Sequence, residues 1–162
     1  MRIAVITCST RSATGERIDE SGQILDAGLV EAGHEVLPRM VVPDDVDQIR
    51  AAVESAIAQG VELVVTTGGT GLTPTDVTPE AIAPMLDRTV PGISETLRAV
   101  SRHRVPTSVL SRGVAGTIGT TLVVTLPGSP GGVRDGLAVL LPIIDHAVDQ
   151  IAAGDHRPGG GV

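Results

Sequence analysis

The chain has 162 residues, a formal net charge of -7 at pH 7, and no Phe, Tyr or Trp. The lack of aromatic side chains argues against single-stranded nucleic-acid binding, which uses them as stacking platforms, and the negative charge gives no general attraction to nucleic-acid phosphates or anionic membranes. The length fits one domain.

The first elements alternate between strand and helix. Residues 2–8, RIAVITC, are apolar and rich in β-branched residues, as in a buried strand, and a polar loop is expected from Ser9 to Gly15. The apolar stripe of the next helix is Ile18, Gly22, Leu25 and Leu29. Gly33 stands where that helix would end. Residues 35–42 predict a weaker strand, since Pro38 lacks a donor for the ladder.

The middle of the chain repeats the pattern. Residues 43–60 predict a helix because apolar residues recur at helical spacing after an acidic start. Residues 61–67, VELVVTT, predict the next buried strand. A helix over residues 79–87 is then expected, with Thr78 as the capping hydroxyl and Pro79 at the first helical position.

The last third contains one segment that is difficult to assign. Residues 91–102 predict a helix, and residues 104–121 include a GVAGTIGTT stretch that reads as a twisted strand with Gly bends. Residues 121–127, TLVVTLP, predict a buried strand. Residues 132–153 carry a helical stripe that Pro142 should kink or split in two.

Strands alternating with helices predict an α/β fold with a mostly parallel sheet covered on both faces. We expect a single domain over residues 1–153 and a flexible, Gly-rich tail over residues 154–162. The start of the chain lacks the features of a signal peptide, and no apolar run is long enough to span a membrane. A soluble, cytoplasmic protein is expected.

Three small polar loops follow strands and are expected at one edge of the sheet, where ligands of such folds bind. They are CSTRS (8–12), GGTGLTPTD (68–76) and PGSPGG (127–132). The central loop is neither a Walker A loop nor a dinucleotide fingerprint. Its glycines permit positive φ and bring backbone N–H groups close to a ligand, so it predicts phosphate binding; the alternative is a plain tight turn.

Two aspartates stand beside these loops. Asp76 precedes the predicted helix at residue 79, and Asp44 follows the strand at 35–42. Either one is explained by an ordinary helix start. The functional interpretation is a pair of carboxylates that hold Mg²⁺ against a nucleotide, since Mg²⁺ takes one or two carboxylates together with substrate phosphates.

The remaining polar candidates carry less information. Cys8, the single cysteine, is interpreted as a small buried apolar residue rather than a nucleophile, and it cannot form an internal disulfide. The basic cluster SRHR (101–104) is typical of a solvated surface, with attraction of an anionic substrate as the alternative. Arg112, beside Ser111, is a fork donor suited to phosphate, and the alternative is an ordinary surface pair.

Four segments in order closely resemble one known family. They are VVTTGGTGLTPTDVTPEAI, DRTVPGISETLR, PTSVLSRGVAG and LVVTLPGSP. The chain resembles, over nearly its whole length, the molybdopterin-binding domain of molybdenum cofactor biosynthesis proteins of the MogA/MoaB type. The resemblance implies a three-layer α/β sandwich that assembles as a homotrimer or hexamer. It also implies binding of molybdopterin, a pterin with a dithiolene and a terminal phosphate.

The adenylyltransferase branch of this family transfers AMP from ATP·Mg²⁺ to that phosphate, and the product is ready for molybdate insertion, so the molybdate-inserting enzyme is a candidate partner. The resemblance implies catalytic or metal-binding roles for Asp76 and Asp44. The implied ligand-contacting positions are Ser9, Arg11, Gly68, Gly69, Thr70, Gly71, Ser111, Gly128 and Ser129.

Three positions depart from the family pattern. Thr10 stands where Asp is common, Thr75 where Arg is frequent, and Gly131 where Lys or another polar residue is frequent. The last two departures remove cations, which favours a pterin-binding or scaffolding protein without turnover as the alternative. A nucleotide hydrolase of the competence-damage type is a further alternative.

Overall fold

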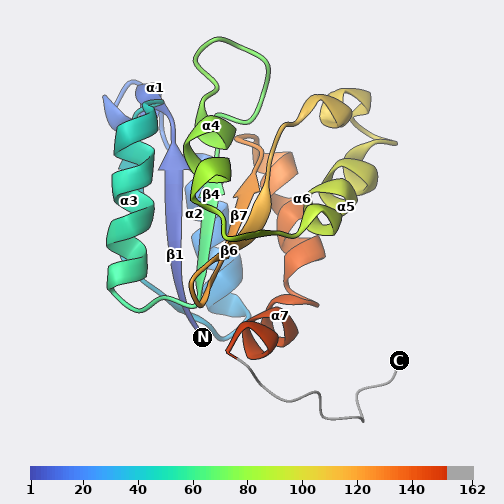
Figure 1. Ribbon diagram of the computed structural model, residues 1–162. Coiled ribbons are helices and arrows are strands. Elements are labelled where there is room, and N and C mark those ends of the chain that lie inside the picture. Colours follow the sequence, from blue (N-terminus) through green and yellow to red (C-terminus); the bar gives the residue numbers. More distant parts are fainter. Residues whose placement is uncertain (153–162) are drawn as a thin grey trace.

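The structure, a computed structural model, describes residues 1–152 and consists of one sheet with helices on both faces (Figure 1). The strands are β1 (Arg2–Cys8), β2 (Glu35–Val36), β3 (Met40–Val42), β4 (Leu63–Thr67), β5 (Arg88–Thr89), β6 (Ala115–Ile118) and β7 (Thr121–Leu126). The sheet order is β2-β1-β4-β7-β6-β5. Both β2 and β3 pair with the same edge of β1: β2 with its first residues and β3 with its last. Strands β1, β2, β3, β4 and β7 pair in parallel. The pairs β5–β6 and β6–β7 are antiparallel. The predicted α/β fold with a mostly parallel sheet is confirmed.

Helices cover the sheet on both sides. The α-helices are α1 (Thr10–Ala13), α2 (Glu20–Glu31), α3 (Val46–Ala58), α4 (Thr78–Ile82), α5 (Pro91–Ser101), α6 (Pro130–Leu140) and α7 (Ile144–Ile151). Two 3-10 helices, η1 (Ala83–Met85) and η2 (Pro106–Leu110), follow α4 and α5. No helix within residues 1–152 is both long and apolar enough to cross a membrane. The predicted tail over residues 154–162 lies outside the described residues.

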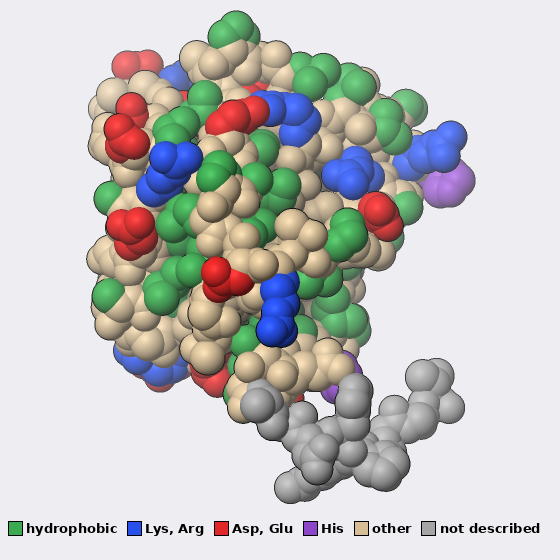
Figure 2. All heavy atoms as spheres, in the orientation of Figure 1, with side chains coloured by type: hydrophobic (Ala, Val, Ile, Leu, Met, Phe, Trp, Pro, Cys, Tyr) green, Lys and Arg blue, Asp and Glu red, His purple; other side chains and the backbone are tan. Residues whose placement is uncertain are grey.

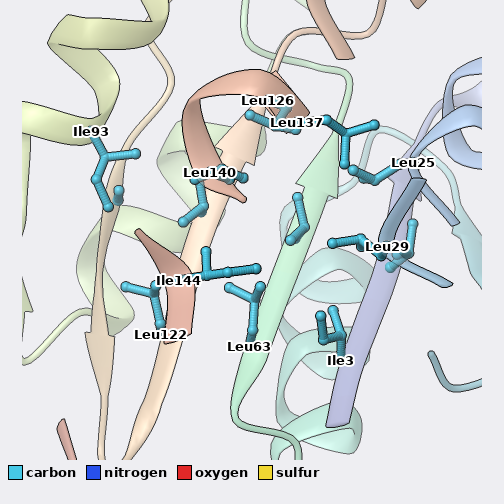
Figure 3. Close-up of a cluster of buried hydrophobic side chains, with 14 of the residues drawn as sticks. Ile3, Leu25, Leu29, Leu63, Ile93, Leu122, Leu126, Leu137, Leu140 and Ile144 are labelled. Carbon is cyan, nitrogen blue, oxygen red and sulfur yellow. The ribbon is translucent and has the colours of Figure 1, made fainter. Parts of the chain in front are cut away.

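The core has two halves, because successive strand residues point to opposite faces of a sheet. Ile3 and its counterparts on β4 and β7 pack against α2, α5, α6 and α7 (Figure 3). Ile6 on the opposite face packs against α3 and α4. Burial of these aliphatic side chains is worth about 1.5–3 kcal/mol for each large residue.

The register brings the three polar loops together. Thr7 near the end of β1 lies beside Thr67 at the end of β4, and Thr67 lies beside Leu126 at the end of β7. Parallel strands with aligned ends place their following loops at one edge of the sheet. The segments after residues 8, 67 and 126 are therefore neighbours, as the sequence predicts.

The helix predicted over residues 79–87 is shorter than expected. It spans Thr78–Ile82 and tightens into η1. Pro84 has no N–H, so the carbonyl of Glu80 loses its helical donor. The Arg50 guanidinium donates to the Glu80 and Ala81 carbonyl oxygens instead, at 3.2 and 3.1 Å.

The prediction that Thr78 caps this helix is wrong. Its hydroxyl donates 2.9 Å to the carbonyl of Gly68 and is fully buried. Val77 stands at the N-cap position and makes no side-chain cap. The Thr78 hydroxyl therefore holds the glycine loop against the helix start.

Other boundaries also differ from expectation. The polar loop from Ser9 contains the short helix α1, because the Ser9 hydroxyl accepts from the amide of Ser12. Ile18, predicted in the apolar stripe of the first long helix, is 76% exposed, since Asp19 caps α2 after it. The weak strand around Pro38 becomes the two short strands β2 and β3.

The remaining predictions match the structure. The helices expected over 43–60 and 91–102 are α3 and α5, and the Gly-containing strand is β6. The helical stripe at the end of the chain is split into α6 and α7 around Pro142. Its expected last residue, 153, lies outside the described part of the chain.

Candidate functional site

Two clefts lie side by side at the edge where β1, β4 and β7 end, and every candidate residue lines at least one of them. The first, here called the aspartate cleft, has a volume of about 700 Å³ and includes Ser9, Arg11, Asp44, Gly68, Gly69, Asp76 and Gly128. The second, here called the serine cleft, has a volume of about 650 Å³ and includes Gly69, Thr70, Gly71, Asp76, Ser111, Gly128 and Ser129. Gly69, Asp76 and Gly128 belong to both and form the rim between the two clefts.

The glycine loop is shaped by close contacts within the protein. Gly68 has a φ of +99°, and a Cβ there would lie 2.3 Å from the carbonyl oxygen of Cys8. Gly69 has a φ of +61°, and its Cβ would lie 2.3 Å from the Thr78 hydroxyl oxygen. Positive φ combined with such approaches leaves room only for glycine. The segment is therefore a tight turn that also lines a cleft, and its binding of phosphate stays a prediction.

Backbone amides at the rim are available to a ligand. The N–H groups of Gly69, Thr70 and Gly71 donate to no acceptor within residues 1–152, and neither do those of Gly128 and Ser129. Unpaired amides in a concave turn form a site for an anion. The rim therefore offers a place for phosphate oxygens.

The two aspartates are held in the same way. Asp44 Oδ2 accepts from the amide and hydroxyl of Thr10, at 2.8 and 2.9 Å. Asp76 Oδ2 accepts from the amide and hydroxyl of Thr73, at 3.0 and 2.6 Å. Within the described residues, the Oδ1 atom of each carboxylate has no hydrogen-bond donor. Each carboxylate is thus fixed through one oxygen and presents the other.

The helix-start explanation does not account for Asp44. The cap of α3 is its neighbour Asp45, whose side chain accepts from the Gln48 amide at 2.9 Å. Thr10, where the family pattern often has Asp, is one of the donors that hold Asp44. A second carboxylate at that position would repel Asp44, so the departure suits this site.

The aspartates fit a metal that is completed by substrate. No group of three or more His, Cys, Asp or Glu residues within residues 1–152 is placed to hold a metal ion. Two carboxylates with unpaired oxygens are the hard donors that Mg²⁺ prefers, and Mg²⁺ commonly takes its other ligands from water and phosphate. Asp44 and Asp76 are the residues that would hold such an ion.

Arg112 holds the loop that carries Asp76, a role that the sequence does not reveal. Its guanidinium donates to the carbonyls of Gly71 and Asp76, at 2.7 and 2.6 Å, and pairs with Glu80. Its own amide donates to the carbonyl of Thr70. The Arg112 side chain also keeps the pKa of Glu80 below its ordinary value through their hydrogen bond. The expected phosphate donor is therefore committed to the protein.

Replacing Arg112 with Ala is expected to loosen residues 71–76. The variant loses three side-chain hydrogen bonds to the loop and to α4, so amide hydrogen exchange over these residues should rise by about tenfold or more. Mass spectrometry of exchanged peptides measures this. Arg112→Lys should share much of the defect because a lysine lacks the planar fork. Arg102→Ala, which removes an exposed charge at the end of α5, should leave the loop unchanged.

The sequence also did not reveal the contacts that Asp19 and Ser21 make at the start of α2. The Asp19 carboxylate accepts from the Thr7 hydroxyl and the Gly22 amide, and it forms an ion pair with Arg39 at 2.9 Å. The Ser21 hydroxyl donates to the carbonyl of Gly128 at 2.9 Å. A cap residue before a helix is the one signal that the sequence offers. These contacts fix the floor of the aspartate cleft and the third loop.

Cys8 is a buried apolar residue, as predicted. It is 1% exposed, and burial raises the pKa of its thiol to about 12. At pH 8 only about one molecule in 10⁴ would carry the thiolate, which is the reactive form. We therefore expect iodoacetamide to label Cys8 at pH 8 after unfolding but not in the folded protein, as read by mass spectrometry. Rapid labelling of the folded protein would show that the thiol is accessible.

The basic residues at the end of α5 lie on an exposed edge of the molecule, where basic and histidine side chains gather at the right of Figure 2. Arg104 in this cluster pairs with Asp135, which also accepts from the Ser101 hydroxyl at 2.6 Å. These two donors, Ser101 first, hold the pKa of Asp135 below its ordinary value. Arg102, His103 and Arg104 are exposed, as predicted, whereas Ser101 is buried. Arg104 also lines the serine cleft.

Comparison with known proteins identifies relatives of this architecture. Residues 4–146 match a family described as "probable molybdopterin binding domain". A bifunctional molybdenum cofactor biosynthesis protein of Chlorobaculum tepidum is 41% identical over 155 residues, which are 96% of this chain and 50% of that protein. This chain therefore spans about half of the length of that relative.

In two further comparisons, the match covers most of this chain and most of the related protein. A protein of Pyrococcus furiosus named molybdopterin adenylyltransferase is 38% identical, over 90% of this chain and 88% of its own. A solved structure of a protein named MogA superposes with a TM-score of 0.90 at 43% identity, over 93% of this chain and 99% of that one.

Proposed function

We propose that this chain, which belongs to the family of probable molybdopterin-binding domains, acts in molybdenum cofactor biosynthesis: it binds molybdopterin and transfers AMP from ATP to the terminal phosphate of the pterin. The P. furiosus relative bears the name of this activity. The observation that carries the proposal is the pair of clefts, of about 700 and 650 Å³, that meet at one rim. Each has the size of a site for one small substrate, and group transfer requires two substrates whose reacting atoms meet.

The chemistry of the walls supports the proposal of one substrate in each cleft. The aspartate cleft, with Asp44 and Asp76, takes the metal-bound triphosphate of ATP. The serine cleft takes the pterin, whose flat ring suits the apolar wall of Val105, Leu110 and Pro127. The terminal phosphate of molybdopterin and the α-phosphate of ATP then meet at the rim, beside the unpaired amides of Gly69 and Gly128.

In the reaction, an oxygen of the terminal phosphate attacks the α-phosphorus of ATP. The bond between the α-phosphorus and the bridging oxygen breaks, and pyrophosphate leaves with that electron pair. The rim amides hold the phosphates in line, and the fixed carboxylates of Asp44 and Asp76 position the nucleotide end. Mg²⁺, when bound, supplies positive charge to the leaving pyrophosphate. No covalent enzyme intermediate is required.

Pyrophosphate release tests the proposal. Purified protein with ATP, Mg²⁺ and molybdopterin should release pyrophosphate and form adenylylated molybdopterin, and release should depend on the pterin. Binding of molybdopterin without release would support the binding or scaffolding alternative, which Thr75 and Gly131 favour because neither supplies a cation to its cleft. Release that does not need the pterin would support a nucleotide hydrolase.

The proposal includes a homotrimer or hexamer, which exposed apolar side chains support. Val100 and Val109, at the end of α5 and on η2, are each about half exposed. Apolar surface of this kind is often covered by another subunit. Light scattering during size-exclusion chromatography measures the assembly, and transfer of the product to a molybdate-inserting enzyme belongs to the same proposal.

A further inference from the structure

The buried hydroxyl of Ser94, on α5, lacks a hydrogen-bond partner in residues 1–152. Ser94 is 5% exposed, and its Oγ atom forms no hydrogen bond within the described residues. A buried hydroxyl without a partner is costly, and native structures usually satisfy it with ordered water or a ligand. The position of Ser94 therefore requires an explanation.

Ser94 lines a small recess next to the serine cleft. The recess has a volume of about 20 Å³, and a single water needs roughly 10–15 Å³. Half of its lining residues also line the serine cleft, namely Ser101, Ser108, Ser111, Pro127 and Gly132. The recess is therefore the inner end of that cleft.

The groups around the recess favour an acceptor oxygen. Ser111 Oγ makes only long hydrogen bonds, to Thr70 Oγ1 at 3.5 Å and from the Gly113 amide at 3.4 Å. Arg98 lines the recess. Its guanidinium forms no ion pair with a carboxylate in residues 1–152, and one of its nitrogens donates to the carbonyl of Ser111. The guanidinium can only donate hydrogen bonds, whereas the two hydroxyls can donate as well as accept, so the recess offers more donors than acceptors to whatever enters.

We infer that Ser94 is a specificity-determining residue of the serine cleft: with Ser111 and Arg98 it holds one water, through which it reads the carbonyl oxygen of the bound pterin ring. The recess holds one small atom group and no ring, so the ring stays in the cleft. This inference rests on the assignment of the pterin to the serine cleft. It goes beyond that assignment because it names the ring edge that the protein recognises.

Two stable pteridines test the inference, with binding to the protein followed by fluorescence. Pterin carries a carbonyl oxygen at position 4, and 2,4-diaminopteridine carries an amino donor there. The wild-type protein should bind pterin about tenfold more tightly, because a water that accepts from the Arg98 guanidinium has its hydrogens left to donate to the ring oxygen and matches an amino group poorly. Ser94→Ala should weaken pterin binding by about fivefold to tenfold and reduce the preference between the two compounds.

Thr66→Val is a matched control. Thr66 is also fully buried, with an unpaired hydroxyl, but it lines neither the recess nor a cleft. This variant should keep the wild-type preference. It should also be at least as stable as wild type, whereas Ser94→Ala should have a lower melting temperature because it loses a bond to water.

The outcomes separate the two proposals. An unchanged preference in Ser94→Ala overturns the role of Ser94 alone. Equal melting temperatures of Ser94→Ala and Thr66→Val overturn the ordered water. If the wild-type protein binds neither pteridine, the assignment of the pterin to the serine cleft is wrong, and the role of Ser94 is wrong with it.

Discussion

Asp76→Asn is expected to lower the rate of pterin-dependent pyrophosphate release by about 10²–10³-fold, the usual loss when one preorganised electrostatic group is removed from an active site. Asparagine keeps an oxygen that can accept from Thr73, so the loop should keep its shape. It removes the negative charge next to the metal-bound phosphates, so Mg²⁺ and ATP should be held less well. Molybdopterin should still bind, because the serine cleft keeps its other walls.

Neighbouring aspartates provide the control. Asp44→Asn should show a defect of the same kind, since Asp44 is fixed through Thr10 as Asp76 is fixed through Thr73. Asp45→Asn changes the next residue by the same chemistry, but Asp45 only caps α3 and lines neither cleft. Because Asn is as good a cap as Asp, that variant should be active. Wild-type turnover by Asp76→Asn, measured at saturating ATP and Mg²⁺, would show that the assigned role is wrong.

The sequence predicts the convergence of these loops where its information is local. A strand followed by small polar residues implies a loop at the edge of a parallel sheet, and this placed Ser9, Gly68 and Gly128 in one region. The proposed ligand came from the resemblance to a family, because loop chemistry alone fits many anions.

Predictions from the sequence were wrong where a side chain forms a hydrogen bond with a residue that is distant in the chain. Thr78 looked like a helix cap because it precedes a proline, yet its hydroxyl holds Gly68, ten residues earlier. Arg112 looked like a surface phosphate donor, yet it holds the carbonyl of Gly71. Such long-range hydrogen bonds leave no periodic pattern in the chain. These long-range hydrogen bonds decide which polar groups remain available to a ligand. The aspartates can be distinguished from helix caps only once these bonds are known.

The glycine loop gives the largest expected effect on stability. Gly68→Ala should destabilise the protein by about 3 kcal/mol or more, because a Cβ at φ +99° is strained and would lie 2.3 Å from the Cys8 carbonyl oxygen. The carbonyl belongs to β1 and cannot move without disturbing its pairing with β3 and β4. A loss of that size lowers the melting temperature of a chain of this length by roughly 6–12 °C.

A second glycine separates backbone strain from crowding. Gly15 also has a positive φ, +79°, but no other group lies within 4 Å of the place that its Cβ would take, so Gly15→Ala should cost only about 1–2 kcal/mol. The difference between the two melting temperatures measures the close approach of the glycine loop to β1. Equal losses would mean that the loop moves aside freely, and a loop that moves aside freely cannot hold the rim amides in place for a phosphate. The stability comparison therefore bears directly on the proposed reaction, without any substrate being present.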